Sequence, residues 1–440
     1  MDNVDPNVAK SSNPMLVAPI VVKSKGWFDF YHQTPLYIRI LIALVIGIVI
    51  GFAVGPNASS LEVFSKIILR LLGALAPPLI LIAVIHVLIT SEIPAQSAGR
   101  LVWLLMLNTT VAILIGLVVA NVLQPGKWSS IPVEPTEIAA KVVKGPNPVD
   151  LLMNNVPKSL FGPLGDQQNV IGVIMLAVAF GVALRKSKDR PLHTFRDLVE
   201  IAYDALLVAL HWLIDLVPIG VLCIVASVVG KEGFEPFKAL GGFVVTVIVA
   251  LLLQSVWYLV RIRLLCWARP MYVLKGMRDA LVMAFSTSSS TVTMPVTYAC
   301  LREKVKLREQ SASLGGLVGA NFNNDGTALY EATAALFVAQ LIGVELSIYQ
   351  QILVILTSVV ASVGAAGIPE AGLVTMTLVF TAVGLPTEKI ALLLTVDWFL
   401  DRCRTTVNVL GDVNVSCVLD GTTSEATALA VSASGAGITD

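Results

Sequence analysis

Charged residues interrupt an otherwise apolar segment, LLLTVDWFLDRCRTTVNVLGDVNV, at residues 392–415. At about 100° per residue, the polar residues of a helix here gather within an arc of about 100°. Six residues share that arc: Asp397, Asp401, Arg404, Thr405, Asn408 and Asp412. Arg402 lies well outside it. The spacing therefore predicts a single polar stripe along one face of a helix.

The stripe suits an amino acid that carries an additional carboxylate. Arg404 offers a planar guanidinium that binds a carboxylate through two hydrogen bonds. Asp401, one turn earlier, can accept a protonated amine, and Thr405 and Asn408 can supply neutral hydrogen bonds. A charge at the bilayer centre costs about 2.5–3.5 kcal/mol on insertion scales, so several on one face need partners. The alternative, an Asp–Arg network that only satisfies itself, stays open at this point.

Two further carboxylates, Asp325 in NFNNDGT and Asp412, are not accounted for by such a substrate. Each lies near asparagine side chains, and an interrupted helix exposes backbone carbonyl groups. Hard oxygen ligands of this kind suit a small cation. The alternative is that each carboxylate only caps a broken helix end.

The composition is that of a membrane protein. Hydrophobic residues make up 56% of the 440 residues and charged residues 14%, with a mean hydropathy of +0.81. Apolar runs of about 18 residues or more recur, each long enough to cross a lipid bilayer as a helix. The formal net charge of zero gives no indication of a nucleic acid partner. The five cysteines form no CxxC motif and are expected to be buried thiols, and no cleaved signal peptide is expected.

Six ordinary membrane helices are expected, near residues 36–55, 65–91, 99–123, 168–185, 197–229 and 239–268. Pro77 and Pro78 predict a kink in the second. The positive-inside rule places three basic segments in the cytoplasm. They are residues 185–190, residues 302–309 and the set Arg261, Arg263, Arg269, Lys275 and Arg278. The N-terminus is then also cytoplasmic, and residues 124–166 lie outside.

The last third of the chain predicts two re-entrant hairpins. Residues 279–301 lie between two cytoplasmic basic segments, so they must enter and leave the membrane on the same side. An apolar helix interrupted at 321–327 follows, and residues 351–386 form a second hairpin that enters from outside. Paired interruptions of this kind predict inverted repeats, with substrate bound near the midplane. The expected fold is an all-α polytopic membrane protein with eight transmembrane helices and two opposed re-entrant helical hairpins.

Four motifs, STSSSTVTMPVT, NNDGTALYEA, AAGIPEAGLVTM and DWFLDRCRTTVNVLGD, resemble the signature segments of the glutamate/aspartate transporter family. This family of dicarboxylate/amino acid:cation symporters includes the excitatory amino acid transporters and archaeal aspartate transporters. The resemblance runs from residue 36 to about residue 418 and is strongest over 280–412. It implies a homotrimer in the plasma membrane that works by an elevator mechanism. The resemblance implies a cytoplasmic N-terminal segment at residues 1–35 and a disordered cytoplasmic tail at residues 419–440. Between them, residues 36–270 form mainly the scaffold and trimer contacts, although the third helix belongs to the transport domain. Residues 271–418 form the core of the transport domain.

The resemblance also implies the binding residues. For an acidic amino acid substrate they are Ser290, Thr327, Ile368, Gly372, Asp401, Arg404, Thr405 and Asn408. Asp401 is implied to bind the amine and Arg404 the side-chain carboxylate, since neutral amino acid members have a small residue at the Arg404 position. Sodium is the implied coupling ion. Its contacts are Gly319, Asn323, Asn408 and Asp412 at one position, Thr109, Thr110, Asn323 and Asp325 at a second, and backbone around Asn321, Ser362, Val363 and Ala365 at a third.

Departures from the family pattern fall in the cation region. Asn324 stands where the family usually has methionine, and Asn321 where threonine is common. Leu105 and Met106 replace an aromatic pair. Glu331 matches a position that the eukaryotic branch uses for proton coupling. Proton-coupled or sodium-independent transport therefore stays open as an alternative, as does a related dicarboxylate or neutral amino acid carrier.

Two other classes of function fit the sequence less well. A channel also uses re-entrant loops, but it requires rings of like charge or carbonyl filters, and here opposite charges alternate. An intramembrane serine enzyme would need a histidine near STSSS, and all four histidines fall earlier in the chain. The sequence predicts a transporter and not an enzyme.

Overall fold

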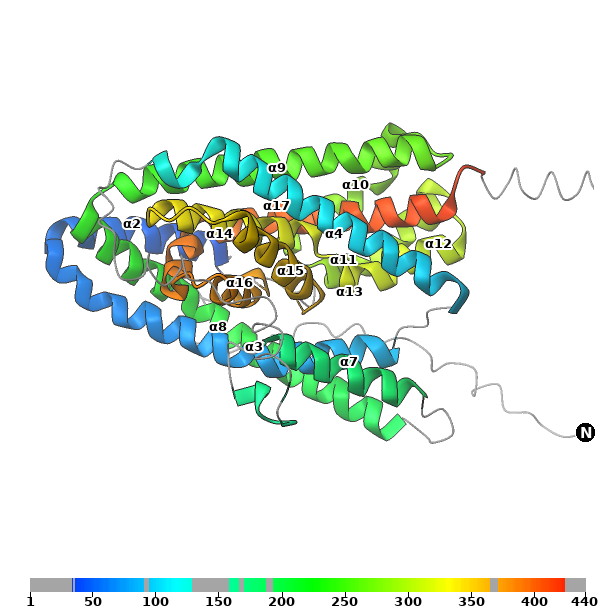
Figure 1. The fold of residues 1–440 in the computed structure, drawn as a ribbon, viewed down its shortest axis with the longest axis horizontal. Helices are drawn as coiled ribbons and strands as arrows, with labels where there is room; N and C mark the ends of the chain where they lie inside the picture. The colour runs from blue at the N-terminus through cyan, green and yellow to red at the C-terminus, as the bar shows by residue number, and fades with distance from the viewer. Residues whose placement is uncertain are drawn as a thin grey trace, which may run out of the picture.

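The computed structural model describes residues 34, 36–90, 95–128, 157, 159–165, 170–186, 193–364 and 371–423, and the regular elements in these ranges are all helical (Figure 1). The long helices are α2 (Leu36–Val54), α3 (Glu62–Thr90), α4 (Ala95–Leu123), α7 (Val170–Lys186), α8 (His193–Glu232), α9 (Glu235–Leu265), α10 (Pro270–Thr287), α11 (Ser290–Ala299), α14 (Asp325–Leu341), α15 (Ile348–Gly364), α16 (Ala371–Ala382) and α17 (Ile390–Asp420). Short helical segments are η1 (Gly55–Leu61), η2 (Pro125–Trp128), η3 (Pro163–Gly165), η4 (Cys300–Val305), α12 (Glu309–Ser313), η5 (Leu314–Gly319), α13 (Ala320–Phe322) and η6 (Thr387–Lys389).

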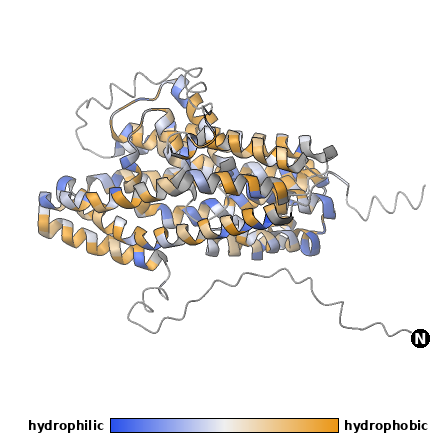
Figure 2. Ribbon diagram, turned by 90° about the horizontal axis from the view of Figure 1, so that it is seen from below, coloured by the Kyte–Doolittle hydropathy of each residue, from blue (hydrophilic) through white to orange (hydrophobic). Residues whose placement is uncertain are grey.

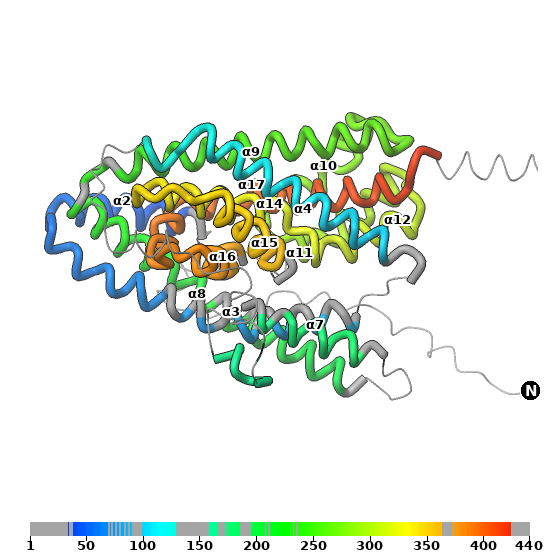
Figure 3. The backbone as a smooth tube through the Cα atoms, in the orientation of Figure 1, coloured from blue at the N-terminus to red at the C-terminus, as the bar shows by residue number. Residues whose placement is uncertain are grey.

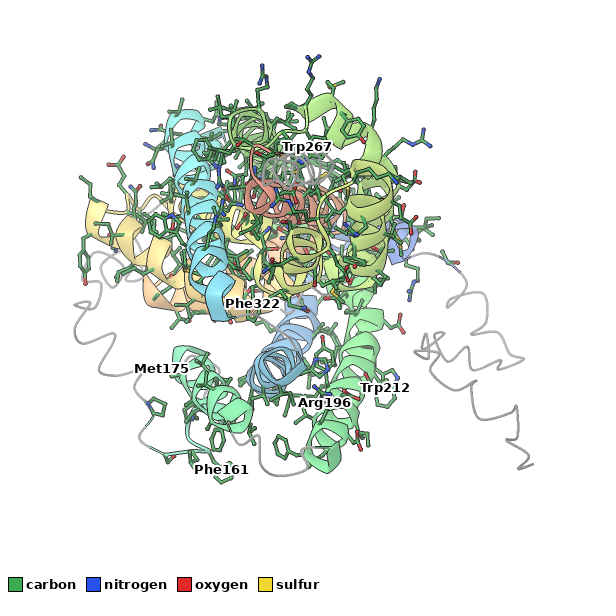
Figure 4. The ribbon with its side chains drawn as sticks, turned by 90° about the vertical axis from the view of Figure 1, so that its right-hand side faces the viewer. Phe161, Met175, Arg196, Trp212, Trp267 and Phe322 are labelled. Atoms are coloured by element: carbon green, nitrogen blue, oxygen red, sulfur yellow. The ribbon has the colours of Figure 1, made fainter. Side chains whose placement is uncertain are left out.

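The helices pack in two groups. In one group α8 packs against α2 and α3, and α3 packs against α7. In the other, α4, α9, α14 and α17 pack against one another, and the shorter helices surround them. Figure 4, viewed along the long axis, shows the helices that carry Met175, Arg196 and Trp212 apart from the part that carries Trp267 and Phe322.

Buried aromatic rings join helices at the centre of the second group. The rings of Phe243 on α9 and Phe337 on α14 lie 4.7 Å apart between centroids, and Tyr330 lies 5.6 Å from Phe243. Helices α4, α9 and α17 run side by side across this group (Figure 3). This packing brings the polar stripe of α17 against α4, α9 and α14.

Apolar side chains also cover much of the outside. Figure 2 shows hydrophobic residues along the long helices and hydrophilic residues gathered mostly toward their ends. In the described part of the chain, four helical stretches are long and apolar enough to cross a membrane: Ile38–Ile68, Gly99–Trp128, Trp212–Lys231 and Pro236–Leu265. Helix α17 is not among them because charged and amide side chains interrupt it. The total of eight transmembrane helices stays a prediction.

The first predicted hairpin is formed by α10 and α11, which pack against each other. A two-residue turn joins them, with Ser288 in the left-handed region at a φ of 54°, and the Ser289 hydroxyl caps α11 by accepting from the backbone N–H of Val292 at 3.2 Å. The first arm begins at Pro270, nine residues before the predicted start at 279, because the chain turns back directly after α9. The side of the membrane from which this hairpin enters stays a prediction.

The predicted break in the next helix is confirmed. Asn323 (φ −98°, ψ 78°) and Asn324 (φ −106°, ψ 49°) leave helical geometry between α13 and α14. Helices α15 and α16, the expected arms of the second hairpin, pack against each other, and their connection at 365–370 lies outside the described residues, so the second hairpin stays a prediction. Helix α3 continues through Pro77 and Pro78, and the kink predicted there stays a prediction.

Arg261 is buried in the structure. It lies inside α9, within the helix predicted at 239–268, and is only 5% exposed, while the cytoplasmic placement of its basic segment stays a prediction. Its Nη1 donates to Oδ1 of Asn108 on α4. Arg263, two residues later, is exposed as expected. The predicted N-terminal segment, most of residues 124–166 and residues 424–440 of the tail lie outside the described residues.

Candidate functional site

The polar stripe of α17 faces inward. All six of its residues are buried, and Arg404 has no exposed surface. Arg402, predicted outside the stripe, turns away and donates from Nη1 to the backbone carbonyls of Phe285 and Ser286 on α10. The helical spacing thus identified correctly which polar side chains share one buried face.

Arg404 lies at the centre of a charged cluster. Its Nη2 donates to Oδ1 of Asp401 at 2.6 Å, and its Nη1 lies 3.0 Å from Oδ1 of Asp397, close enough for an ion pair but without hydrogen-bond geometry. The guanidinium covers the ring of Tyr330, with Cζ 3.9 Å from the ring centroid. One arginine with two aspartates leaves a net negative charge, and a buried cluster of this kind is expensive in a membrane unless it binds something.

Residues of the broken helix and of both hairpins approach this cluster. A Cβ placed on Gly372 at the start of α16 would lie 3.2 Å from Nη1 of Arg404 and 3.0 Å from Cγ2 of Thr327. The Ser290 hydroxyl at the first hairpin tip donates to the carbonyl of Ala320 at 3.2 Å. These contacts bring the backbone of the second hairpin to Arg404 and the tip of the first hairpin to the broken helix.

Asn408 joins α17 to the start of α14. Its Oδ1 accepts from the backbone N–H of Gly326 at 2.7 Å, and its Nδ2 lies 3.4 Å from Oγ1 of Thr327 and from Oδ1 of Asn324. Thr405 is buried on the same face of α17. Of the predicted substrate residues, Ile368 lies outside the described part of the chain.

A second cluster surrounds Asp412. Asn323 donates from Nδ2 to Oδ1 of Asp412 at 3.1 Å and to the backbone carbonyl of Asn408 at 3.2 Å. A Cβ on Gly319 would lie 3.1 Å from the same Oδ1. Oδ2 of Asp412 and Oδ1 of Asn323 are buried without a hydrogen-bond partner. Buried polar oxygens are normally satisfied, so these two fit ligands of a small hard cation such as sodium.

The remaining predicted cation residues are spread around this cluster. Asn324 donates from Nδ2 to the backbone carbonyl of Ser362 at 3.0 Å, which ties the break to the second hairpin. Asn321 turns instead to the carbonyl of Leu317 at 3.1 Å. The side chain of Val363 and the whole of Ala365 are not described. The part of the chain that the structure describes contains no group of three or more His, Cys, Asp or Glu suited to a metal ion.

Asp325 has a different environment from Asp412. The Thr109 hydroxyl on α4 lies 2.7 Å from its Oδ1 as a donor, and the Tyr258 hydroxyl on α9 donates to its Oδ2. Within the described residues no hydrogen bond joins Thr110 to this carboxylate. Both oxygens of Asp325 are therefore already engaged by the protein.

Glu331, the predicted proton site, is fully buried on α14. The Thr375 hydroxyl on α16 donates to its Oε1, and its Oε2 has no hydrogen-bond partner. The sequence gives no sign of four further residues that contact predicted site residues or Arg261. They are Tyr258, Tyr330, Thr375 and Asn108. Spacing along one helix carries no signal for such contacts, because each partner comes from a different helix.

Comparison with known proteins places the chain in a family. A family model described as the sodium:dicarboxylate symporter family matches residues 36–422. The chain is 41% identical over 253 residues to excitatory amino acid transporter 3 of Oryctolagus cuniculus, which covers 57% of this chain and 48% of that protein. It is 41% identical over 251 residues to excitatory amino acid transporter 1 of Homo sapiens, covering 56% and 45%. It is 31% identical over 450 residues to excitatory amino acid transporter 3 of Bos taurus, covering 89% and 86%. The first two alignments thus span about half the length of those relatives.

Proposed function

Because the chain belongs to the sodium:dicarboxylate symporter family, we propose that it is a secondary active transporter that moves aspartate or glutamate across the membrane together with sodium. The observation that carries this proposal is the buried Arg404 between Asp397 and Asp401, beside the backbone of Gly372. A site that pairs one guanidinium with two carboxylates can take a ligand that has both an amine and an extra carboxylate.

Binding proceeds as an exchange of partners. The side-chain carboxylate of the substrate takes Nη1 and Nη2 of Arg404, and Asp401 is released to accept the substrate amine. Asp397 stays beside Arg404 and keeps the guanidinium in place over Tyr330. Thr327 and Asn408, already in contact, supply neutral hydrogen bonds to the backbone end of the substrate. The exchanges at Arg404 and Asp401 each replace one charged hydrogen bond with another, and the α-carboxylate of the substrate is met by neutral donors.

Ligand selectivity tests the proposal. Purified protein should bind aspartate, bind asparagine weakly because it lacks the second carboxylate, and bind succinate weakly because it lacks the amine. Loss of a buried charge pair typically costs about 2–5 kcal/mol, so Arg404→Ala should weaken aspartate binding by a factor of about 30 or more. Equal affinity for aspartate and succinate would point instead to a dicarboxylate carrier, and equal affinity for aspartate and asparagine to a neutral amino acid carrier.

Sodium is the proposed coupling ion because Asp412 and Asn323, which are joined by a hydrogen bond, each have a buried oxygen without a hydrogen-bond partner. When bound there, sodium supplies a positive charge beside Asp412. Protons are the second candidate, because Glu331 is buried with one partnerless oxygen. Uptake with choline in place of sodium at constant pH distinguishes the two: sodium coupling predicts its loss, and proton coupling at Glu331 predicts its persistence.

The two groups of helices support an elevator movement. We place the scaffold and trimer contacts on α2, α3, α7 and α8, and the moving substrate carrier on the group around α17. Helix α9 packs against α4 and α17, so in this proposal it moves with the carrier. We further propose a homotrimer in the plasma membrane with both termini in the cytoplasm. Crosslinking of single cysteines placed on α3 and α16, which are in contact here, would report the movement by its dependence on aspartate and sodium.

A further inference from the structure

Arg261 is a buried positive charge in the middle of the carrier group. It lies in the last turns of α9, is 5% exposed, and donates through Nη1 to Oδ1 of Asn108. Among the described residues, no carboxylate lies within 4.0 Å of its guanidinium. A buried guanidinium without a direct ion pair needs a negative charge nearby to compensate it.

The same two helices that hold Arg261 also hold Asp325. On α9, Tyr258 lies one turn before Arg261 and donates to Oδ2 of Asp325. On α4, Thr109 follows Asn108 directly and donates to Oδ1 of Asp325 at 2.7 Å. The residues that hold Asp325 and those that hold Arg261 are thus neighbours on α4 and lie one turn apart on α9. Arg261 is thus the cation that α9 and α4 bring toward Asp325.

Gly411 on α17 packs closely against the residues around Asp325. A Cβ on Gly411 of α17 would lie 2.4 Å from Nδ2 of Asn323, 2.9 Å from the Tyr258 hydroxyl and 3.2 Å from Oδ2 of Asp325. Groups from α9, α14 and α17 therefore meet at this point. In contrast, Asp412 and Asn323 each retain a buried oxygen without a partner. Buried oxygens without a partner are thus present at Asp412 and Asn323, whereas both oxygens of Asp325 already accept hydrogen bonds from the protein.

We propose that Arg261 is a tethered cation, which supplies to Asp325 the positive charge that the family resemblance assigns to a coupled sodium ion. This inference rests on the proposed sodium symport, and it adds that the chain binds one sodium ion fewer than the resemblance implies. The residues that carry it are Arg261, Asn108, Tyr258 and Asp325, none of which depends on the substrate cluster around Arg404.

The test compares four variants of the full-length protein in detergent. Arg261→Met removes the charge and retains length, and Arg261→Lys retains the charge. The double variant Arg261→Met with Asp325→Asn removes both charges, and Arg263→Met changes an exposed arginine two residues away as the matched control. Arg261→Met and the double variant both lose the hydrogen bond to Asn108. A difference in sodium dependence between them therefore reports the effect of the negative charge of Asp325.

The first readout is the dependence of aspartate binding on sodium concentration. By linkage, the slope of log Kd for aspartate against log sodium concentration should steepen by about one for Arg261→Met, because a sodium ion must now neutralise Asp325. Arg261→Lys, the double variant and Arg263→Met should retain the parent slope. An unchanged slope in a folded Arg261→Met protein would overturn the proposal.

The second readout needs no substrate. Sodium chloride, relative to choline chloride, should raise the melting temperature of Arg261→Met more than that of the parent or the double variant. If Arg261→Met fails to fold even in sodium, or if the double variant also fails to fold, Arg261 serves the fold through Asn108 and the proposal is wrong. Absence of aspartate binding by the parent would count against the proposed function alone, since the sodium-dependent melting shift tests Arg261 separately.

Discussion

Nη2 of Arg404 lies 2.6 Å from Oδ1 of Asp401, three residues earlier on the same helix, and the same guanidinium covers the ring of Tyr330. Helical spacing alone brings the first pair together, since residues three apart are neighbours on a helix surface. The tyrosine comes from α14, which begins at the break after Asn324. The charged cluster therefore depends on the packing of α17 against the broken helix.

Asp397→Asn should weaken aspartate binding and lower stability. The change retains the shape of the side chain but removes one of the two carboxylates beside Arg404, and breaking a buried ion pair costs about 3–5 kcal/mol. We expect a lower melting temperature and a raised Kd for aspartate in titration calorimetry. Glu388→Gln, an exposed carboxylate just before α17, is the control and should change neither. A parent-like Kd for Asp397→Asn would show that Asp397 does not position Arg404.

Gly372→Ala should reduce aspartate affinity, because the added methyl group would lie 3.0 Å from Cγ2 of Thr327 and 3.2 Å from Nη1 of Arg404. These distances are tighter than ordinary van der Waals contact, so either the second hairpin or the arginine must shift. Gly241→Ala in α9 meets no atom within 4 Å and should behave like the parent. Equal Kd values for aspartate in the two variants would contradict this placement of the hairpin.

Asp412→Asn should raise the sodium concentration needed for aspartate binding. Asp412 is the charged member of the cluster with Asn323 and Gly319, and a neutral amide attracts a cation far less. We expect a shift of at least about tenfold in the sodium midpoint, corresponding to about 1.4 kcal/mol. Asp279→Asn, an exposed carboxylate on α10, is the control. The same midpoint in both variants would exclude Asp412 as a sodium ligand.

Glu331→Gln tests the proton alternative. If Glu331 carries a coupled proton, the glutamine variant should lose the pH dependence of uptake while retaining aspartate binding, since glutamine can still accept from Thr375. If sodium alone is coupled, parent and variant should respond equally to pH. Uptake into proteoliposomes at fixed sodium and at several pH values provides the comparison.

Asp420→Asn should affect stability and not binding. Asp420 at the end of α17 accepts from Nε1 of Trp267 at 2.7 Å and from the backbone N–H of Arg308 at 2.8 Å, which joins the α9–α10 loop to α12. We expect a lower melting temperature with unchanged Kd for aspartate and unchanged sodium midpoint. An altered sodium midpoint would mean that this end of α17 communicates with Asp412.

Periodicity and composition predict much of this arrangement. The stripe on α17, the break at Asn323 and Asn324 and the turn between α10 and α11 all follow from local signals: spacing, polar interruptions and turn residues. What they do not predict is pairing between distant helices. Counts of basic residues treat Arg261 only as one member of a basic set, and they give no sign of its buried partner Asn108, which lies 153 residues earlier. Tyr258 and Tyr330 likewise look like ordinary apolar residues until their helices pack against Asp325 and Arg404.

The central claim is concentrative uptake of an acidic amino acid that depends on Arg404. The most direct measurement is the accumulation of labelled aspartate in proteoliposomes with an inward sodium gradient, for the parent chain and for Arg404→Ala. The account predicts accumulation above the external concentration by the parent, its collapse when the sodium gradient is removed, and its loss in Arg404→Ala. Absence of accumulation by the parent, or accumulation by Arg404→Ala equal to that of the parent, would contradict it.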